Sequence, residues 1–423
     1  MKYGLILILL ACAVFAQEVS TQTITYQSTV SNLTLEALVF TDNKPGPKPM
    51  LVVMHSYAGT MADVIDVGQR FAEVGVLAIA PNMRGRSSNE SYSLGDDSMY
   101  DLFDVYDAIN VAAESFSGDI ENVNILGYSG GGANVMAMVQ KFPDLFNGGY
   151  AFFGIPNYCD GDSWFQDGLY DRARLSKRIG NGSGDLSIGF HNRCLARNAL
   201  KQIPNAKKTR VRLYVDRDES VAPLKYSQEY AWQYQQRGFL LNVHLDVSDE
   251  KTQIRYTHGY PKDVPDLRVP ELSIAQEVIH GKKNVSLDEN GTLNVGGYVK
   301  TKRFTVLLGD EVFEGAASKG REGLAEVGYD LKKGEFSFVD KSYAPGIKNA
   351  TLILHGNEPN EKVSVRAQGR KRSSIATENG DASFFISFDA DAQTDSNMPM
   401  IRVAIGIVLM LGVVIFFVRK RFR

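Results

Sequence analysis

The sequence predicts a doubly wound, mostly parallel α/β sheet with a lid insertion, followed by a small all-β sandwich-like domain and one C-terminal transmembrane helix. Three observations predict this order. Apolar strand-like runs alternate with helical patterns from about Thr23 to His280, short segments of alternating polarity follow, and a long apolar run precedes a basic C-terminus. The 423 residues leave room for two domains, and the net charge of -3 gives no reason to expect a nucleic-acid partner.

The first residues, Met1–Ala16, have the features of a secretory signal peptide. Lys2 precedes the apolar run Leu5–Leu10, which is too short to span a bilayer, and Val14–Ala16 before Gln17 form an A-x-A-like cleavage site. A lipoprotein cleavage pattern is an alternative, although Cys12 comes very early for it. The mature chain is therefore expected to be exported.

Residues 17–282 are expected to form the α/β domain. Runs such as Leu51–Met54 are continuously apolar, as in parallel strands that are covered on both faces. The predicted strands are Leu35–Phe40, Met50–His55, Val76–Ala80, Asn122–Leu126, Gly148–Phe153, Arg210–Val215 and Leu241–Val247. The predicted helices are Met61–Val74, Met99–Phe116, Gly131–Lys141 and Leu224–Arg237.

A long polar insertion, at about residues 155–208, interrupts this alternation. Insertions of that length at a sheet edge form lids or remain disordered loops. It holds Cys159 and Cys194, the two cysteines left after signal removal, and an oxidising compartment favours one disulfide between them.

Residues 283–388 are expected to form the β-sandwich-like domain, because period-two segments are separated by turns and no long helix pattern intervenes. These segments are Phe304–Leu308, Gly334–Val339, Ala350–His355, Lys362–Ala367 and Ala382–Phe388. A polar linker, residues 389–397, follows.

The transmembrane helix is predicted at residues 398–418, with a cytoplasmic basic tail at residues 419–423. Its core Val403–Val418 would be about 24 Å long at ~1.5 Å per residue, and extension back to Met398 adds length with Arg402 snorkelling toward the headgroups. A buried core helix is the alternative, but the terminal cations favour a span with the preceding domains outside the cell. A cleaved sorting signal also remains open. Glycosylation sequons fit secretion and occur at Asn32, Asn89, Asn181, Asn284, Asn290 and Asn349.

The stretch Ile125–Asn134, ILGYSGGGAN, places Ser129 among glycines just after an apolar run. A flexible loop would use the same residues. The sharp strand-to-helix turn that presents a nucleophilic serine, G-x-S-x-G, is the catalytic alternative, since bulky neighbours would make the strand and helix collide. This interpretation requires a base, an acid and an oxyanion site elsewhere in the chain.

His258 is the preferred base among the six histidines, because it follows a strand in a glycine-flanked loop, RYTHGYP. Of the others, His244 falls inside a predicted strand, and His280 ends a helix. His191 lies in the insertion, His355 lies in the C-terminal domain, and His55 ends a strand where a glycine-rich turn begins. A carboxylate must then orient the imidazole, and Asp216, Asp218 and Glu219 all follow the predicted strand Arg210–Val215.

These motifs resemble the α/β-hydrolase superfamily over roughly Thr23–His280, and within it the catalytic domain of prolyl oligopeptidases, dienelactone hydrolases and acetyl esterases. Lys141–Tyr158 resembles a Y-P-D-L-F segment of those peptidases, and THGY resembles their H-G-F. The resemblance implies the triad Ser129, Asp218 and His258, because the chain order matches and Asp218 has the D-x-x-V spacing to Val221. Asp216 is the fallback acid.

The same resemblance implies an oxyanion hole formed by the backbone amides of Tyr57, in MHSYAGT, and Gly130. The chain departs from the family in Ser56, where glycine is usual, and in Gly130, where the family has an aromatic residue or alanine. No metal cluster, nucleotide loop or haem motif occurs in the sequence, so no cofactor is expected.

The resulting hypothesis is an extracytoplasmic, membrane-anchored serine hydrolase that cleaves a small peptide or carboxylic ester through an acyl-enzyme. Its expected partners are that substrate and the lipid bilayer. The alternative is a non-catalytic surface adhesion or structural protein that reuses the fold.

Overall fold

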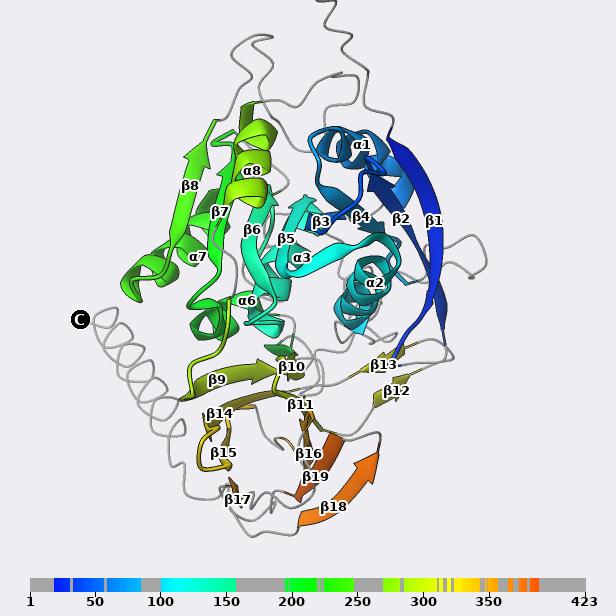
Figure 1. The fold of residues 1–423 in the computed structure, drawn as a ribbon. Helices are drawn as coiled ribbons and strands as arrows, with labels where there is room; N and C mark the ends of the chain where they lie inside the picture. Colours follow the sequence, from blue (N-terminus) through cyan, green and yellow to red (C-terminus); the bar gives the residue numbers. More distant parts are fainter. Residues whose placement is uncertain are drawn as a thin grey trace, which may run out of the picture.

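The computed structural model contains an eight-stranded sheet covered by helices and, beyond one end of it, a second region made of strands (Figure 1). The described residues are 19–30, 33–56, 59–84, 100–156, 195–196, 198–218, 222, 224–246, 269–281, 285–309, 312–314, 318–320, 323–342, 347, 349–356, 364–367, 373–378 and 381–387.

The eight-stranded sheet has the strand order β1-β2-β4-β3-β5-β6-β7-β8. Its strands are β1 (Ser20–Gln27), β2 (Thr34–Thr41), β3 (Lys48–Met54), β4 (Leu77–Pro81), β5 (Gly118–Tyr128), β6 (Phe146–Phe152), β7 (Arg210–Val215) and β8 (Leu241–Leu245). From β4 to β8 all neighbours are parallel, whereas β1 and β2 form an antiparallel edge. The mostly parallel sheet predicted from the sequence is confirmed.

Strand β1 was not predicted. Its sequence STQTITYQ is mostly polar, and only Tyr26 among its side chains is buried. An edge strand that contributes so little to the core lacks the apolar signal by which buried strands are recognised.

Helices cover both faces of the sheet, which explains the continuously apolar strands. One core contains residues of α2 (Tyr100–Phe116), α3 (Gly130–Lys141) and α7 (Leu224–Gln236), and the core on the opposite face contains residues of α1 (Ile65–Glu73) and α8 (Val269–His280). The predicted helix Met61–Val74 is divided into a 3-10 turn η1 (Met61–Val64) and α1, with a capping box between Thr60 and Asp63.

The end of the predicted insertion contributes to this core. Residues 199–206 form α6 (Ala199–Gln202) and a 3-10 turn η2 (Ile203–Ala206), and Ala199, Ile203 and Ala206 are completely or almost completely buried beside α3. The central part of the insertion lies outside the described residues.

The C-terminal region is all β, as expected, but its described strands form one nine-stranded sheet rather than two separate layers. The strand order is β17-β15-β14-β9-β10-β11-β16-β19-β18. The strands are β9 (Asn290–Gly296), β10 (Tyr298–Lys300), β11 (Phe304–Leu308), β14 (Leu324–Asp330), β15 (Glu335–Asp340), β16 (Asn349–Leu354), β17 (Ser364–Ala367), β18 (Ser373–Glu378) and β19 (Asp381–Ser387). A separate pair comprises β12 (Val312–Glu314) and β13 (Ser318–Gly320).

This sheet bends around a single core. Phe304 of β11 lies 5.3 Å from Phe336 of β15, measured between ring centroids, although β14, β9 and β10 stand between them in the sheet order. Right-handed twist allows a long sheet to close over its own apolar face in this way. The C-terminal region therefore buries its apolar side chains inside one curved sheet and not between two separate sheets.

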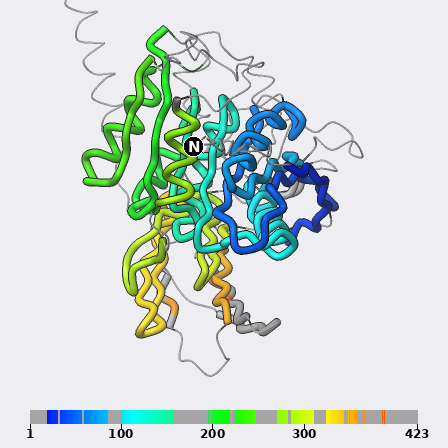
Figure 2. The backbone as a smooth tube through the Cα atoms, turned by 45° about the horizontal axis from the view of Figure 1, so that its top comes forward, coloured from blue at the N-terminus to red at the C-terminus, as the bar shows by residue number. Residues whose placement is uncertain are grey.

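The two regions share a tightly packed seam at the carboxyl end of α3 (Figure 2). Tyr298 of β10 is fully buried in the core of the first region, with its ring centroid 5.2 Å from that of Phe103. Lys141 is also fully buried and donates hydrogen bonds to the carbonyls of Gly296 and Tyr298. At ~1.5 Å per residue, α3 places this seam about 18 Å from the residue at its start.

Among the described residues no helix is both long and apolar enough to cross a bilayer. The predicted signal peptide, the linker 389–397, the span 398–418 and the tail 419–423 lie outside the described residues.

Candidate active site

Ser129 stands at the turn where β5 ends and α3 begins. Its backbone dihedrals are φ 56° and ψ -117°, a conformation that an L-residue adopts only when its surroundings enforce it. Two backbone hydrogen bonds provide this restraint: the Ser129 amide donates to the carbonyl of Phe152 at 2.8 Å, and its carbonyl accepts from the amide of Ala133 at 3.0 Å. Ser129 thus lies in a strand-to-helix turn, as the catalytic alternative requires.

The glycines around Ser129 are required by close backbone contacts. A Cβ on Gly127 would lie 2.4 Å from the backbone of Gly131, and a Cβ on Gly131 would lie 2.4 Å from the carbonyl oxygen of Met54. Real Cβ atoms do not approach other atoms so closely. The start of α3 can therefore press against the ends of β5 and β3 only with glycine at these positions.

Gly130, the first residue of α3 and a predicted oxyanion donor, is partly exposed beside Ser129. The first amides of a helix have no intrahelical acceptor and carry the positive end of the helix dipole. This place suits stabilisation of a developing negative charge. The other predicted donor, Tyr57, lies outside the described residues.

His55 supports the segment that follows β3. It is buried, its Nδ1 lies 2.8 Å from the carbonyl oxygen of Ser56, and its Nε2 accepts a hydrogen bond from the amide of Met83 at 3.1 Å. These two contacts assign the tautomer with the proton on Nδ1. His55 therefore connects this segment to the chain that follows β4.

The predicted acids lie just after β7. Asp216 is buried and its Oδ1 accepts a hydrogen bond from the Asp218 amide at 2.9 Å, whereas Asp218 is exposed. Because β5, β6 and β7 are parallel, this turn and Ser129 share the carboxyl edge of the sheet. The predicted base His258 lies outside the described residues, and so do Cys159 and Cys194.

A row of stacked rings lies directly beneath this edge and was not anticipated from the sequence. Tyr128, Phe152, Tyr214 and His244 occupy paired positions on β5, β6, β7 and β8. Their successive ring centroids are 4.7, 4.1 and 4.7 Å apart. Burial, followed by the charge of Arg212, lowers the pKa of His244. Tyr128 and Phe152 are the last residues of their strands, and Tyr214 and His244 are the last but one. The row becomes visible only with the strand register, because the four strands lie far apart in the sequence.

The hydroxyl of Tyr128 donates a hydrogen bond to Oε1 of Glu271 at 2.9 Å. Glu271 lies in the first turn of α8 and is completely buried. A carboxylate of α8 therefore holds Tyr128, the residue immediately before Ser129.

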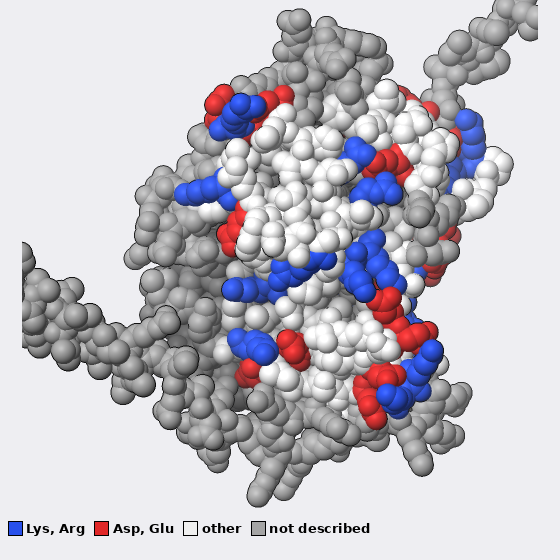
Figure 3. Space-filling view, turned by 90° about the vertical axis from the view of Figure 1, so that its left-hand side faces the viewer, with Lys and Arg blue, Asp and Glu red and all other residues white. Residues whose placement is uncertain are grey.

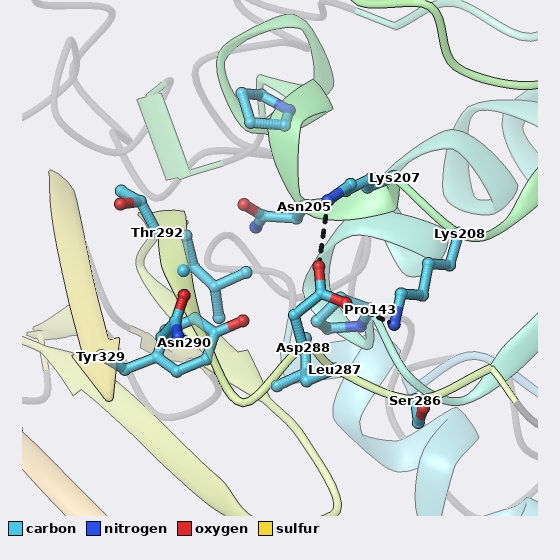
Figure 4. Close-up of a pocket in the computed structure, with 13 residues that line it drawn as sticks. Pro143, Asn205, Lys207, Lys208, Ser286, Leu287, Asp288, Asn290, Thr292 and Tyr329 are labelled. Carbon is cyan, nitrogen blue, oxygen red and sulfur yellow. Dashed lines mark hydrogen bonds and ion pairs between the residues drawn. The ribbon is translucent and has the colours of Figure 1, made fainter. Parts of the chain in front are cut away.

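A cavity of about 200 Å³ opens at the other end of α3, in the seam with the C-terminal region (Figure 4). Lys207 and Lys208 at its rim both pair with Asp288, at 3.0 and 2.7 Å, and these contacts lower the pKa of the Asp288 carboxyl. Pro143, just beyond the end of α3, also lines it. The cavity is thus separated from Ser129 by the length of that helix.

Lysine and arginine side chains gather across the middle of the face that Figure 3 shows. The ion pairs of Lys207 and Lys208 with Asp288 neutralise part of the charge near the seam. The described residues that line the cavity do not include Ser129.

The sequence is similar to a family of hydrolases and to one curated protein. A sequence model of the Dienelactone hydrolase family matches residues 35–223, which include β2 to β7 and Ser129. Among curated proteins, Protein usf of Aquifex pyrophilus is 29% identical over 121 residues, covering 26% of this chain and 52% of that protein. The chain thus spans about half the length of this curated relative. The family match supports a hydrolase.

The chain is also similar to the solved structures of a peptidase and an esterase. The Pyrococcus horikoshii acylaminoacyl peptidase has a TM-score of 0.47 and 17% identity, covering 64% of this chain and 42% of that chain. Esterase Est22 has a TM-score of 0.48 and 15% identity, covering 62% of this chain and 82% of that chain.

Proposed function

Because the chain belongs to the α/β-hydrolase superfamily, we propose that it is a serine hydrolase that cleaves a small peptide or a carboxylic ester. The strained conformation of Ser129 is the observation that carries this proposal. Backbone strain of this kind costs about 1–3 kcal/mol and persists where the surrounding structure enforces it, which is typical of active sites.

In the proposed mechanism His258 removes the hydroxyl proton of Ser129 while the serine oxygen attacks the carbonyl carbon of the substrate. The carboxylate of Asp218 orients the imidazole and stabilises the imidazolium. Backbone amides of Gly130 and Tyr57 donate to the oxyanion of the tetrahedral intermediate. As this intermediate collapses, the His258 imidazolium gives its proton to the departing amine or alcohol, and an acyl-enzyme remains. His258 then takes a proton from water as its oxygen attacks the acyl carbon, and that proton returns to the Ser129 oxygen when the acid product leaves.

The placement of the catalytic region outside the cell is part of the same proposal. It rests on the apolar run and terminal cations of residues 398–423 and on the signal-like residues 1–16. A chain stopped near Asp395 should be recovered as a soluble protein, whereas the full chain should resist extraction from membranes by alkaline carbonate. Recovery of both chains in the soluble fraction would contradict the anchor.

The decisive experiment uses a fluorophosphonate probe, which labels activated serines. The wild type should be labelled, and Ser129→Ala should remove labelling and lower turnover on the order of 10⁴- to 10⁶-fold while the protein remains folded. His258→Ala should be similarly severe. An unlabelled, well-folded wild type would instead favour the non-catalytic adhesion or structural role.

A further inference from the structure

Glu271 is a completely buried carboxyl group that contacts Tyr128, the residue before the proposed nucleophile. Burial of a carboxylate costs several kcal/mol unless it forms compensating hydrogen bonds, so its retention in a core position calls for a reason. Its Oε1 accepts a hydrogen bond from the Tyr128 hydroxyl, with 2.9 Å between the two oxygens, and Tyr128 directly precedes Ser129.

The second carboxylate of the same helix provides a comparison. Glu277 accepts a hydrogen bond from the Tyr150 hydroxyl at 3.1 Å, and it also forms ion pairs with Arg210 and Arg212. Tyr150 lies in the middle of β6, two residues before the carboxyl end of that strand. Glu277 thus contacts the body of the sheet, whereas Glu271 contacts its catalytic edge.

The position of α8 gives the Tyr128–Glu271 hydrogen bond its significance. This helix begins at Val269, directly after the chain segment that contains His258, and Glu271 lies in its first turn. On the other side, Tyr128 is the last residue of β5. This side-chain hydrogen bond therefore joins the residue before the proposed nucleophile to the helix that follows the proposed base in the sequence.

We propose that Glu271 is a positioning residue, which holds the turn at Ser129 in fixed register with α8 through the hydroxyl of Tyr128. The inference rests on the proposed serine hydrolase function. Stacking on Phe152 fixes the plane of the Tyr128 ring, and the bond to Glu271 fixes its far end, so the peptide that leads into Ser129 cannot rotate. A displacement of about 1 Å at a reacting group can cost on the order of 100-fold in rate.

The test compares two matched pairs, each a tyrosine and the α8 glutamate that it contacts: Tyr128→Phe with Glu271→Leu, and Tyr150→Phe with Glu277→Leu as controls. Hydrolysis of p-nitrophenyl acetate gives kcat and KM, and melting temperature reports stability. The first pair should lower kcat about 10- to 100-fold with little change in KM, and the double variant should be no worse than the more severe single variant. The controls should lower the melting temperature but leave kcat unchanged.

Glu271→Gln completes the design, because its amide oxygen can still accept the Tyr128 hydroxyl proton and should restore most of kcat relative to Glu271→Leu. Tyr128→Phe removes one atom and keeps the test valid if Glu271→Leu does not fold. A normal kcat for Tyr128→Phe would overturn the inference, as would equal losses in both pairs. If the wild type takes no fluorophosphonate label, the proposed function itself fails and this inference with it.

Discussion

At the scale of single residues, the proposed site combines the strained backbone of Ser129 with a turn after β7 that holds both candidate acids. Asp216 is buried and its carboxylate accepts the amide proton of Asp218, which leaves the exposed Asp218 carboxylate at the edge of the sheet. The two aspartates therefore have different surroundings. Asp216 holds the turn through the Asp218 amide, and Asp218 is the acid in the proposed triad.

Substitution of each aspartate by asparagine should separate these roles. Asp218→Asn should lower kcat on the order of 10⁴-fold, because an amide no longer stabilises the imidazolium and can hold the wrong tautomer. Asp216→Asn keeps an oxygen that accepts the Asp218 amide proton and should be less damaging. Steady-state kinetics on one ester substrate decide between them, and a larger loss at Asp216 would transfer the role of the acid to that residue.

At the scale of elements, the site depends on how closely α3 approaches the sheet. The helix packs in the core through residues such as Val135 and Val139, while its first turn touches the carbonyl groups at the end of β3. Backbone contact at this point sets the position of the Gly130 amide relative to Ser129. The glycines are therefore part of the site geometry and not merely a permissive loop.

Gly131→Ala should disturb this contact without removing any functional group. The added methyl group would sit 2.4 Å from the carbonyl oxygen of Met54 and 2.7 Å from that of His55, so α3 must move away from β3. We expect destabilisation of about 1–3 kcal/mol and slower fluorophosphonate labelling of Ser129. Thermal unfolding and labelling rates measured together provide the check, and wild-type values for both would show that the contact is not needed.

At the scale of the whole molecule, the C-terminal β region is bound to the end of the α/β region that is remote from Ser129. Tyr298 and Lys141 occupy one shared core, and Asn205 exchanges hydrogen bonds of 2.8 Å with the backbone of Asn294. Asp144 lies in the same seam, is buried, and accepts the amide proton of Lys302 at 2.9 Å. Burial raises the pKa of its carboxyl from 3.8 to about 6.

This pKa makes the seam sensitive to pH. The folded chain binds the Asp144 proton more tightly than the unfolded chain, so the contribution to stability is full below pH 3.8 and is lost as the pH rises through about 6. The loss corresponds to about 3 kcal/mol at ~1.4 kcal/mol per pKa unit.

Asp144→Asn removes this titration and retains an acceptor for Lys302. The free energy of unfolding of the variant, measured relative to the wild type in urea, should therefore rise by up to about 3 kcal/mol between pH 4 and pH 7. A difference that stays constant over this range would contradict the assignment.

Local sequence patterns were sufficient for much of the fold. Buried parallel strands appear as apolar runs, and the Gly127–Gly131 pattern indicates the turn at Ser129 because the steric requirement lies within a few residues. Strand β1 could not be predicted because its side chains are mostly exposed. The single bent sheet could not be predicted because curvature leaves no periodic signal in the sequence.

By itself the sequence determined the alternating architecture and the nucleophile candidate, since both follow from the spacing of apolar residues and glycines along the chain. Only the tertiary structure decided which distant residues support them. Tyr128 and Glu271 are 143 positions apart, and Lys141 and Gly296 are 155 apart. The order and register of the strands determine which distant residues meet. A one-residue change in the register of β5 would turn Tyr128 to the opposite face of the sheet.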